Sequence, residues 1–128
     1  MFKRVAVLLD CPINLLPISV TENTLLPPYS ETSPERAILD RTPGPVVEFG
    51  RNDCGICRAA LPLITEAMTG VNVPHYRIQD GKGRRLGRSF GIKLWPTLIM
   101  LLDGEEVGRI VRPAAVDEIV LKLQIFEP

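Results

Sequence analysis

Two cysteines spaced three residues apart, Cys54 and Cys57, constrain this chain more than any other feature. They follow the apolar run 46–49 and open the stretch 57–68, in which apolar residues recur at helical spacing. A sulfur at the first turn of a helix meets unpaired backbone N–H groups and the positive end of the helix dipole, both of which favour a thiolate. We therefore expect Cys54 to be a nucleophile. Cys57 lies on the same helix face and should close a reversible disulfide with it.

Size and composition indicate one ordinary globular domain. The chain has 128 residues, of which 45% are hydrophobic and 23% are charged. Fifteen basic residues balance fifteen acidic ones, so the net charge favours neither nucleic acid nor a membrane as a partner. No apolar run approaches the ~20 residues that span a bilayer, and Asp10 interrupts the only run that resembles a signal peptide. Three cysteines are too few for the disulfide framework of a small secreted domain, so we expect a cytoplasmic protein.

The pattern of apolar, glycine and proline residues predicts alternating helices and strands from residue 34 onward. The expected helices cover 34–41, 57–68, 84–90 and a last stretch that begins at Pro113, and the expected strands cover 46–49, 71–79, 97–102 and 107–111. The dipeptide Asp103-Gly104 indicates a tight hairpin between the last two strands. This order predicts an α/β fold with a mixed central sheet flanked by helices, in which the helix at the cysteine pair joins two parallel strands.

The first 32 residues are expected to form an N-terminal extension, and residues 33–128 the α/β domain. Four prolines interrupt the extension, at positions 12, 17, 27 and 28. Residues 3–9 and 18–21 have the β-branched and aliphatic content of short strands. The third cysteine, Cys11, lies in this extension, and we expect it to be a bystander rather than a regulatory thiol.

Five segments occur in an order that is typical of one family. They are the strand 46–49, the motif Cys54-Gly55-Ile56-Cys57 followed by Pro62, the segment 90–92, the turn Trp95-Pro96-Thr97 and the hairpin at 103–104. Over about residues 34–126 the chain therefore resembles the thioredoxin family. The resemblance implies a thioredoxin-like fold and the activity of a thiol–disulfide oxidoreductase that reduces or exchanges disulfides in proteins, with no cofactor.

The resemblance also assigns roles to residues around the cysteine pair. Pro96 corresponds to a proline that is cis in thioredoxin-like proteins and faces the dithiol, and Trp95 would then line the groove in which a substrate segment docks. Glu48 stands six residues before Cys54, where the family usually buries an aspartate. Burial should raise the pKa of this carboxyl group, so that it takes the proton of Cys57.

Two departures from the family bear on partner choice and on reduction potential. The aromatic residues that usually precede the motif are replaced by Gly50-Arg51-Asn52-Asp53. The proline between the cysteines is replaced by Ile56, which with Gly55 forms the expected helix N-terminus. Two nearby arginines should favour a thiolate at the first cysteine, whereas Asp53 should oppose it, and the sign of their net effect stays open.

Other interpretations of these residues remain. Cys11, Cys54, Cys57 and His75 have the composition of a zinc site, although structural zinc sites usually bring a second closely spaced pair of ligands, which the chain lacks. We therefore expect no metal, and we expect His75 to be a plain surface or edge residue. Residues 77–93 contain six basic residues and a single acid. Such an excess of positive charge is typical of a solvated surface or of one that steers an acidic partner. The stretch lacks the interleaved aromatic residues of nucleic-acid binding.

These observations lead to two functional hypotheses. In the first, the Cys54 thiolate attacks a disulfide of a substrate protein, a mixed disulfide forms, and Cys57, helped by Glu48, releases the reduced substrate. The resemblance implies that a separate reductase regenerates the dithiol, and we expect a monomer or a weak dimer. In the second, the chain is a thioredoxin-fold binding or chaperone-like module whose dithiol is a sensor or is idle.

Overall fold

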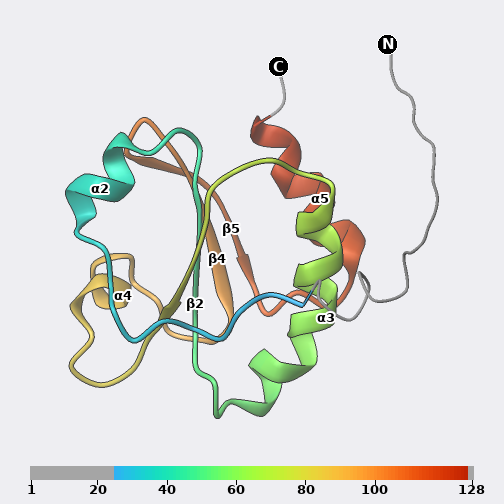
Figure 1. Ribbon diagram of the computed structural model, residues 1–128, viewed down its shortest axis with the longest axis horizontal. Helices are drawn as coiled ribbons and strands as arrows, with labels where there is room; N and C mark the ends of the chain where they lie inside the picture. The colour runs from blue at the N-terminus through green and yellow to red at the C-terminus, as the bar shows by residue number, and fades with distance from the viewer. Residues whose placement is uncertain (1–24, 127–128) are drawn as a thin grey trace, which may run out of the picture.

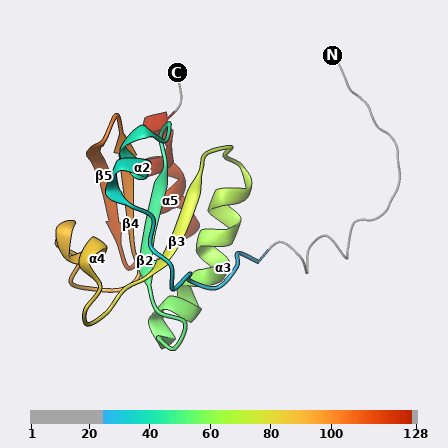
Figure 2. The same ribbon diagram turned by 60° about the vertical axis from the view of Figure 1, so that its left-hand side comes forward.

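The computed structural model describes residues 25–126, in which two helical layers enclose a four-stranded mixed sheet (Figure 1, Figure 2). The elements are α2 (Arg36–Arg41), β2 (Val46–Gly50), α3 (Gly55–Thr69), β3 (His75–Gln79), α4 (Arg85–Ser89), β4 (Thr97–Leu102), β5 (Glu105–Val111), α5 (Val116–Leu123) and the 3-10 turn η2 (Gln124–Phe126). The strand order in the sheet is β3-β2-β4-β5. Helices α3 and α5 cover one face of the sheet, and α2 and α4 cover the other.

Parallel and antiparallel pairs occur where the sequence predicts them. β2 and β3 run parallel and are connected through α3, whereas β4 pairs antiparallel with both β2 and β5. At the turn between β4 and β5, Asp103 and Gly104 have φ angles of 52° and 83°, the left-handed conformations that a two-residue hairpin needs. The predicted α/β fold, with a mixed sheet flanked by helices, is therefore confirmed.

One strand is shorter than predicted. The strand expected over 71–79 begins only at His75, because Pro74 has no N–H for the ladder and its carbonyl instead accepts a hydrogen bond from the start of β2. The preceding residues form the loop after α3. The strands expected over 3–9 and 18–21, and the third cysteine, Cys11, lie outside the described residues.

The alternation of side chains along β2 decides what lies beneath α3. Val46 packs in the core cluster that α3 and α5 share, whereas Val47 and Phe49 pack in the cluster under α2 and α4. Glu48 comes two residues after Val46 and therefore shares its face of the sheet. A fully buried carboxyl group thus lies under the helix that begins at the cysteine pair.

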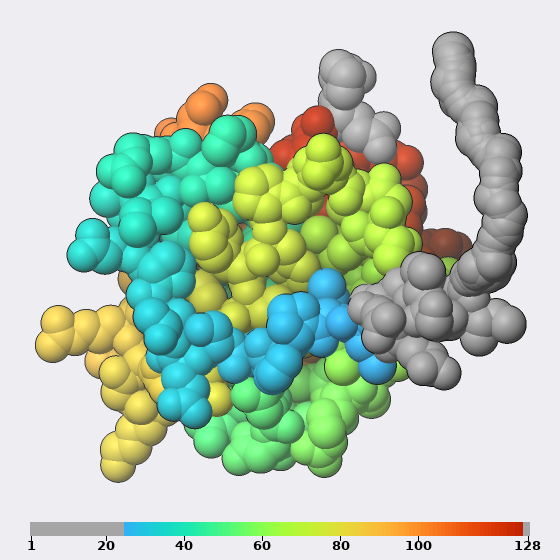
Figure 3. Space-filling view, viewed as in Figure 1, coloured from blue at the N-terminus to red at the C-terminus, as the bar shows by residue number. Residues whose placement is uncertain are grey.

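Residues 25–32, which we call the edge segment, run along the outer edge of β3. Ser30 forms a parallel bridge to β3, with hydrogen bonds of 2.8 Å from Ser30 N to Arg77 O and from Gln79 N to Ser30 O. Figure 3 shows this blue segment crossing the molecule between the green and yellow parts of the chain. The pairing brings the side chain of Tyr29, which is 5% exposed, into the interior.

Candidate active site

Cys54 occupies the N-cap of α3, the position expected for the nucleophile. Its backbone is extended, with φ −96° and ψ 121°, and its Sγ accepts a hydrogen bond of 3.3 Å from the backbone N–H of Cys57. Gly55 and Ile56 form the start of the first turn. The side chain of Cys54 is half-buried, so this sulfur lies at the open end of the helix and is accessible from solution.

The surroundings of Cys54 lower the pKa of its thiol. Partial burial acts in the opposite direction, but hydrogen bonds from the side chain and backbone of Cys57 and from the backbone of Ile56 outweigh it. The guanidinium group of Arg112 adds a favourable charge. Arg112 was not predicted as a neighbour of Cys54, because this residue follows β5 and is far from the motif along the chain.

The acid next to the motif is paired with an arginine. Arg51 Nε lies 2.9 Å from Asp53 Oδ1, at the surface of the molecule. Their hydrogen bond and attraction lower the pKa of Asp53. The largest effects on the Cys54 thiol are burial and the hydrogen bonds at the start of α3, rather than the charges that precede the motif.

Cys57 has the opposite properties. Its side chain is 2% exposed, and burial raises the pKa of its thiol to about 11. A backbone N–H of Arg51 and the hydroxyl group of Tyr29 act against this rise, while Cys54 adds to it. Both cysteines are free thiols. An accessible thiol of low pKa beside a buried thiol of high pKa is the arrangement that an attacking and a resolving cysteine need.

The turn before β4 is connected to the cysteine pair through Arg112. The Trp95–Pro96 peptide bond is cis, as the resemblance implies. Arg112 donates hydrogen bonds of 2.9 Å from its backbone N–H to Pro96 O and from Nε to Trp95 O. The indole Nε1 of Trp95 donates to Asp80 Oδ2 at 2.8 Å, which orients the half-buried ring. Because Arg112 also acts on Cys54, one side chain joins the prolyl turn to the neighbourhood of the first sulfur.

Glu48 is fully buried, as expected, but the prediction that its pKa is raised is wrong. Arg77 lies opposite Glu48 in the β2–β3 register, and His75 lies two residues before it on the same face. Arg77 Nε and Nη2 donate to the two carboxylate oxygens at 3.0 and 2.9 Å, and His75 Nε2 lies 2.9 Å from Oε1. Burial alone raises the pKa of Glu48, but the bonds from His75 and Arg77 and the charge of Arg77 lower it to about 2. Glu48 is therefore ionised.

Sequence reasoning missed the three side chains that hold Glu48. His75, expected at the surface or at an edge, begins the outermost strand β3, but its side chain is only 10% exposed. Arg77, expected on a solvated face, is buried. Tyr29 donates its hydroxyl hydrogen to Glu48 Oε2. A lone histidine after a proline, an arginine in a basic run and a tyrosine after two prolines each predict exposed positions. Only a buried acid at position 48 indicates that a cation must lie nearby.

The described part of the chain contains neither a cluster of metal ligands nor a membrane-spanning helix. Within residues 25–126, no three histidine, cysteine or acidic side chains are grouped so that they could hold a metal ion. In the same range, every helix is too short or too polar to cross a membrane.

Comparison with known proteins assigns the family. The model of the family described as Thioredoxin matches residues 28–124. The chain belongs to the thioredoxin family. Among solved structures it is similar to the reduced form of thioredoxin 2 from Pseudomonas aeruginosa PAO1, with 44% identity and a TM-score of 0.70 over 78% of this chain and 94% of the other. A mutant thioredoxin from Halobacterium salinarum NRC-1 shares the fold at 19% identity, with a TM-score of 0.65 over 79% and 90% of the two chains. Thioredoxin H-type from Fagopyrum esculentum is 27% identical over 84 residues, which are 65% of this chain and 72% of the relative.

The family and the cysteine pair together give the class of reaction. As a member of the thioredoxin family with both cysteines close together at the start of α3, the chain is a thiol–disulfide oxidoreductase. Members of the thioredoxin family act on disulfides in proteins, and a reductase returns them to the dithiol form.

The edge segment fills the space that is left by the missing side chain of Gly50. Gly50 stands at a position where thioredoxins commonly have an aromatic residue. A Cβ atom on Gly50 would lie 2.5 Å from Tyr29 Cζ and 2.6 Å from its hydroxyl oxygen. The phenol ring of Tyr29 therefore fills the space beside β2 that a side chain at position 50 would otherwise enter.

Proposed function

We propose that this chain reduces disulfides in other proteins, with Cys54 as the attacking thiolate and Cys57 as the resolving thiol. The Cys54 sulfur attacks one sulfur of the substrate disulfide, and the other substrate sulfur leaves as a thiolate. Cys57 then attacks Cys54 in the mixed disulfide, which releases the second substrate sulfur and leaves a Cys54–Cys57 disulfide. The observation that supports this assignment most strongly is the N-cap position of Cys54, where donors from the helix lower its pKa while that of Cys57 is raised.

The substrate is proposed to dock beside the prolyl turn. In this proposal the extended backbone around the substrate disulfide lies against Trp95 and pairs with the chain next to Pro96. Gly55 and Ile56 border the attacking sulfur at the helix N-terminus. Ile56 is 44% exposed, so it offers the substrate an apolar contact where many thioredoxins have a proline.

A basic groove next to Trp95 supports a preference for acidic substrate segments. This groove has a volume of about 450 Å³ and is lined by four cations, Lys82, Arg84, Arg88 and Lys93. The one acid in the groove, Asp80, is 6% exposed and accepts the hydrogen bond from Trp95. A substrate with carboxylates beside its disulfide would therefore meet an excess of positive charge.

Regeneration and location follow from the same proposal. A separate reductase would supply two electrons to the Cys54–Cys57 disulfide, since the dithiol is consumed in each turnover. We propose the cytoplasm as the location, supported by the small and odd number of cysteines, which is typical of chains in a reducing compartment. We propose a monomer or a weak dimer as the working form.

Reduction of insulin by dithiothreitol tests the proposed function. We expect the wild-type chain to accelerate precipitation of the insulin B chain, and Cys54→Ser to lower the rate to that of dithiothreitol alone. Cys57→Ser should lose turnover but accumulate a mixed disulfide with the substrate, whereas Cys11→Ser should keep the wild-type rate. Wild-type turnover by Cys54→Ser would contradict the proposal. A dithiol that does not titrate as a two-electron couple in glutathione buffers would support the binding-module hypothesis instead.

A further inference from the structure

The hydroxyl group of Tyr29 lies between the buried carboxylate and the buried thiol. It donates to Glu48 Oε2, and Tyr29 and Cys57 line the same pocket. The hydroxyl group also acts to lower the pKa of the Cys57 thiol. Burial, the backbone of Arg51 and the Cys54 thiol have larger effects on the pKa of Cys57 than Tyr29 has. The phenol of Tyr29 is a neutral O–H donor, unlike the thiol of Cys54 and the backbone of Arg51.

The structure holds the phenol ring of Tyr29 firmly in this place. The side-chain amide of Asn52 clamps the backbone of Tyr29, accepting from its N–H at 2.8 Å and donating to its carbonyl at 3.1 Å. The guanidinium group of Arg77 lies 4.0 Å from the ring centroid. Gly50 has no side chain and therefore leaves room for the ring beside β2. Since Asn52 lies two residues before Cys54, the clamp also joins the edge segment to the loop before the cysteine motif.

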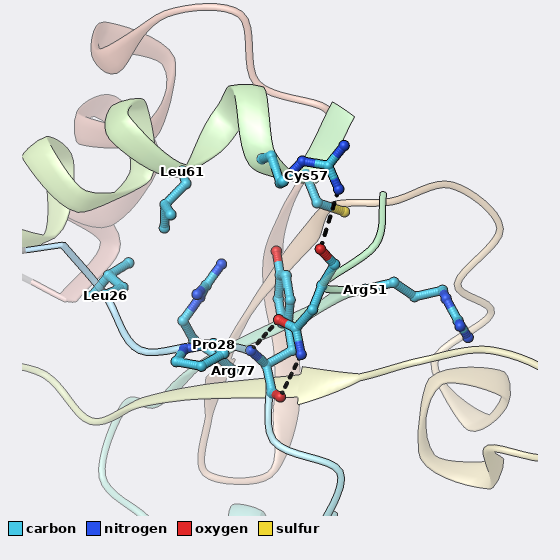
Figure 4. Close-up of a pocket in the computed structure, with 9 residues that line it drawn as sticks. Leu26, Pro28, Arg51, Cys57, Leu61 and Arg77 are labelled. Atoms are coloured by element: carbon cyan, nitrogen blue, oxygen red, sulfur yellow. Dashed lines mark hydrogen bonds between the residues drawn. The ribbon is translucent and has the colours of Figure 1, made fainter. Parts of the chain in front are cut away.

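A pocket connects this hydroxyl group and Cys57 to solvent. It has a volume of about 300 Å³ and is lined by Tyr29 and Cys57 among others. Figure 4 shows Cys57 and Leu61 on α3 across from Leu26 and Pro28 of the edge segment. Water can therefore reach the region of Cys57 from the side of the edge segment, away from the half-buried Cys54.

We propose that Tyr29 is a catalytic residue of the resolving step, in which its hydroxyl group turns from Glu48 to Cys57 Sγ and donates a hydrogen bond to the attacking thiolate. The inference deepens the proposed function and rests on it. Cys57 gives its proton to a solvent base in the pocket, water or buffer. Its sulfur then forms a bond with Cys54 Sγ, the bond between Cys54 and the substrate breaks, and the substrate sulfur leaves with the electron pair and takes a proton from solvent.

The other partners of Glu48 make this turn of the hydroxyl group feasible. When the Tyr29 O–H leaves, the carboxylate keeps two hydrogen bonds from Arg77 and one contact with His75. Glu48 therefore remains ionised and paired throughout, and in this proposal it is a positioning residue that holds the hydroxyl group until a thiolate forms. This role replaces the expected transfer of the Cys57 proton to Glu48.

A single-turnover reaction with 5,5′-dithiobis(2-nitrobenzoate) measures the two steps separately. Attack by Cys54 releases the first thionitrobenzoate, and attack by Cys57 on the mixed disulfide releases the second. Tyr29→Phe keeps the ring and removes only the hydroxyl group. We expect the first step to be unchanged and the second to slow by about tenfold or more, since the lost hydrogen bond is one to a charged group.

A matched control and a second readout separate catalysis from stability. Tyr76→Phe removes the hydroxyl group of the other tyrosine, which lies 3.4 Å from the Thr42 hydroxyl, and should leave both steps unchanged. In a Cys54→Ser background, Tyr29→Phe should raise the pKa of Cys57 as measured from the pH dependence of its alkylation. Equal resolving rates and equal Cys57 titration in Tyr29→Phe and wild type would overturn the inference. That result would leave the proposed function intact if insulin reduction still required Cys54.

Discussion

A single carboxylate, Glu48, decides the electrostatics beneath the cysteine pair. It lies on the α3 face of β2, fully buried, with hydrogen bonds from Arg77 and Tyr29 and a contact to His75. Breaking such a buried pair by removing one partner leaves an uncompensated charge, which is among the more destabilising changes that a single substitution can make. The stability of this site therefore depends on the ionisation of Glu48.

Stability should fall in acid through this residue. The pKa of Glu48 is lowered from 4.5 to about 2, so the unfolded state binds the proton more readily than the folded state. The resulting stabilisation is fully present above about pH 4.5 and is lost as the pH falls toward 2; it amounts to roughly 3 kcal/mol. We expect the thermal midpoint of the wild type to drop steeply in this window.

Glu48→Gln checks this expectation. The variant should be less stable at pH 7, because Arg77 loses its counter-charge, and its midpoint should vary less between pH 4.5 and 2. Glu106→Gln removes an exposed carboxylate that is also paired with an arginine, and it should change stability little. An acid slope in Glu48→Gln as steep as in the wild type would show that another group is responsible.

At the scale of elements, β2 and the edge segment pack closely because Gly50 has no side chain. Gly50 ends β2 on the face under α3, and the ring of Tyr29 lies where its Cβ would be. The amide clamp of Asn52 on the Tyr29 backbone and the bridge from Ser30 to β3 hold the edge segment at this contact. The contact thus depends on the smallest residue at position 50.

Gly50→Ala should displace the phenol ring. The added carbon would approach Tyr29 atoms to 2.5 Å, and we expect a loss of about 1–3 kcal/mol in the free energy of unfolding, as for other overpacked cores. Gly70→Ala is a suitable control, because nothing lies within 4 Å of a Cβ at Gly70. Urea unfolding measures both variants. Equal stability of Gly50→Ala and Gly70→Ala would mean that the edge segment adapts to the extra carbon.

Most elements were predictable because their signals are local. The N-cap cysteine, the Asp103-Gly104 hairpin and the apolar run of β4 each specify their own backbone. The edge segment was not predictable as a partner of β3, because its prolines indicate a loop and its pairing is between residues far apart in the sequence. The neighbours of Glu48 were missed for the same reason, since the β2–β3 register brings them together only in the folded sheet.

At the scale of the whole molecule, a net charge of zero hides an uneven distribution. The groove beside Trp95 gathers four cations, whereas its one acid is buried. The sequence could predict the basic run between 77 and 93, but not that Arg77 turns inward while the later cations stay beside Trp95. Attraction for acidic substrates would then add to the chemistry of the cysteine pair.

Reduction of peptide disulfides with different flanking charges tests this attraction. We expect a peptide with glutamates beside its disulfide to react several times faster than one with lysines at low salt, and the difference to shrink as the salt concentration rises. Lys93→Glu should reduce the preference. Lys122→Glu, an equal charge change on α5 in the opposite layer, should not. A preference that is insensitive to salt and to Lys93→Glu would exclude the groove as its source.

The bridge made by Ser30 has one more consequence. By pairing with Arg77 O and Gln79 N on the outer side of β3, Ser30 covers part of a strand edge that would otherwise be open to pairing with a second molecule. The segment that places Tyr29 in the interior therefore also protects part of the sheet edge against self-association. Substitutions that detach residues 25–32 from β3 should therefore favour self-association and displace Tyr29 at the same time.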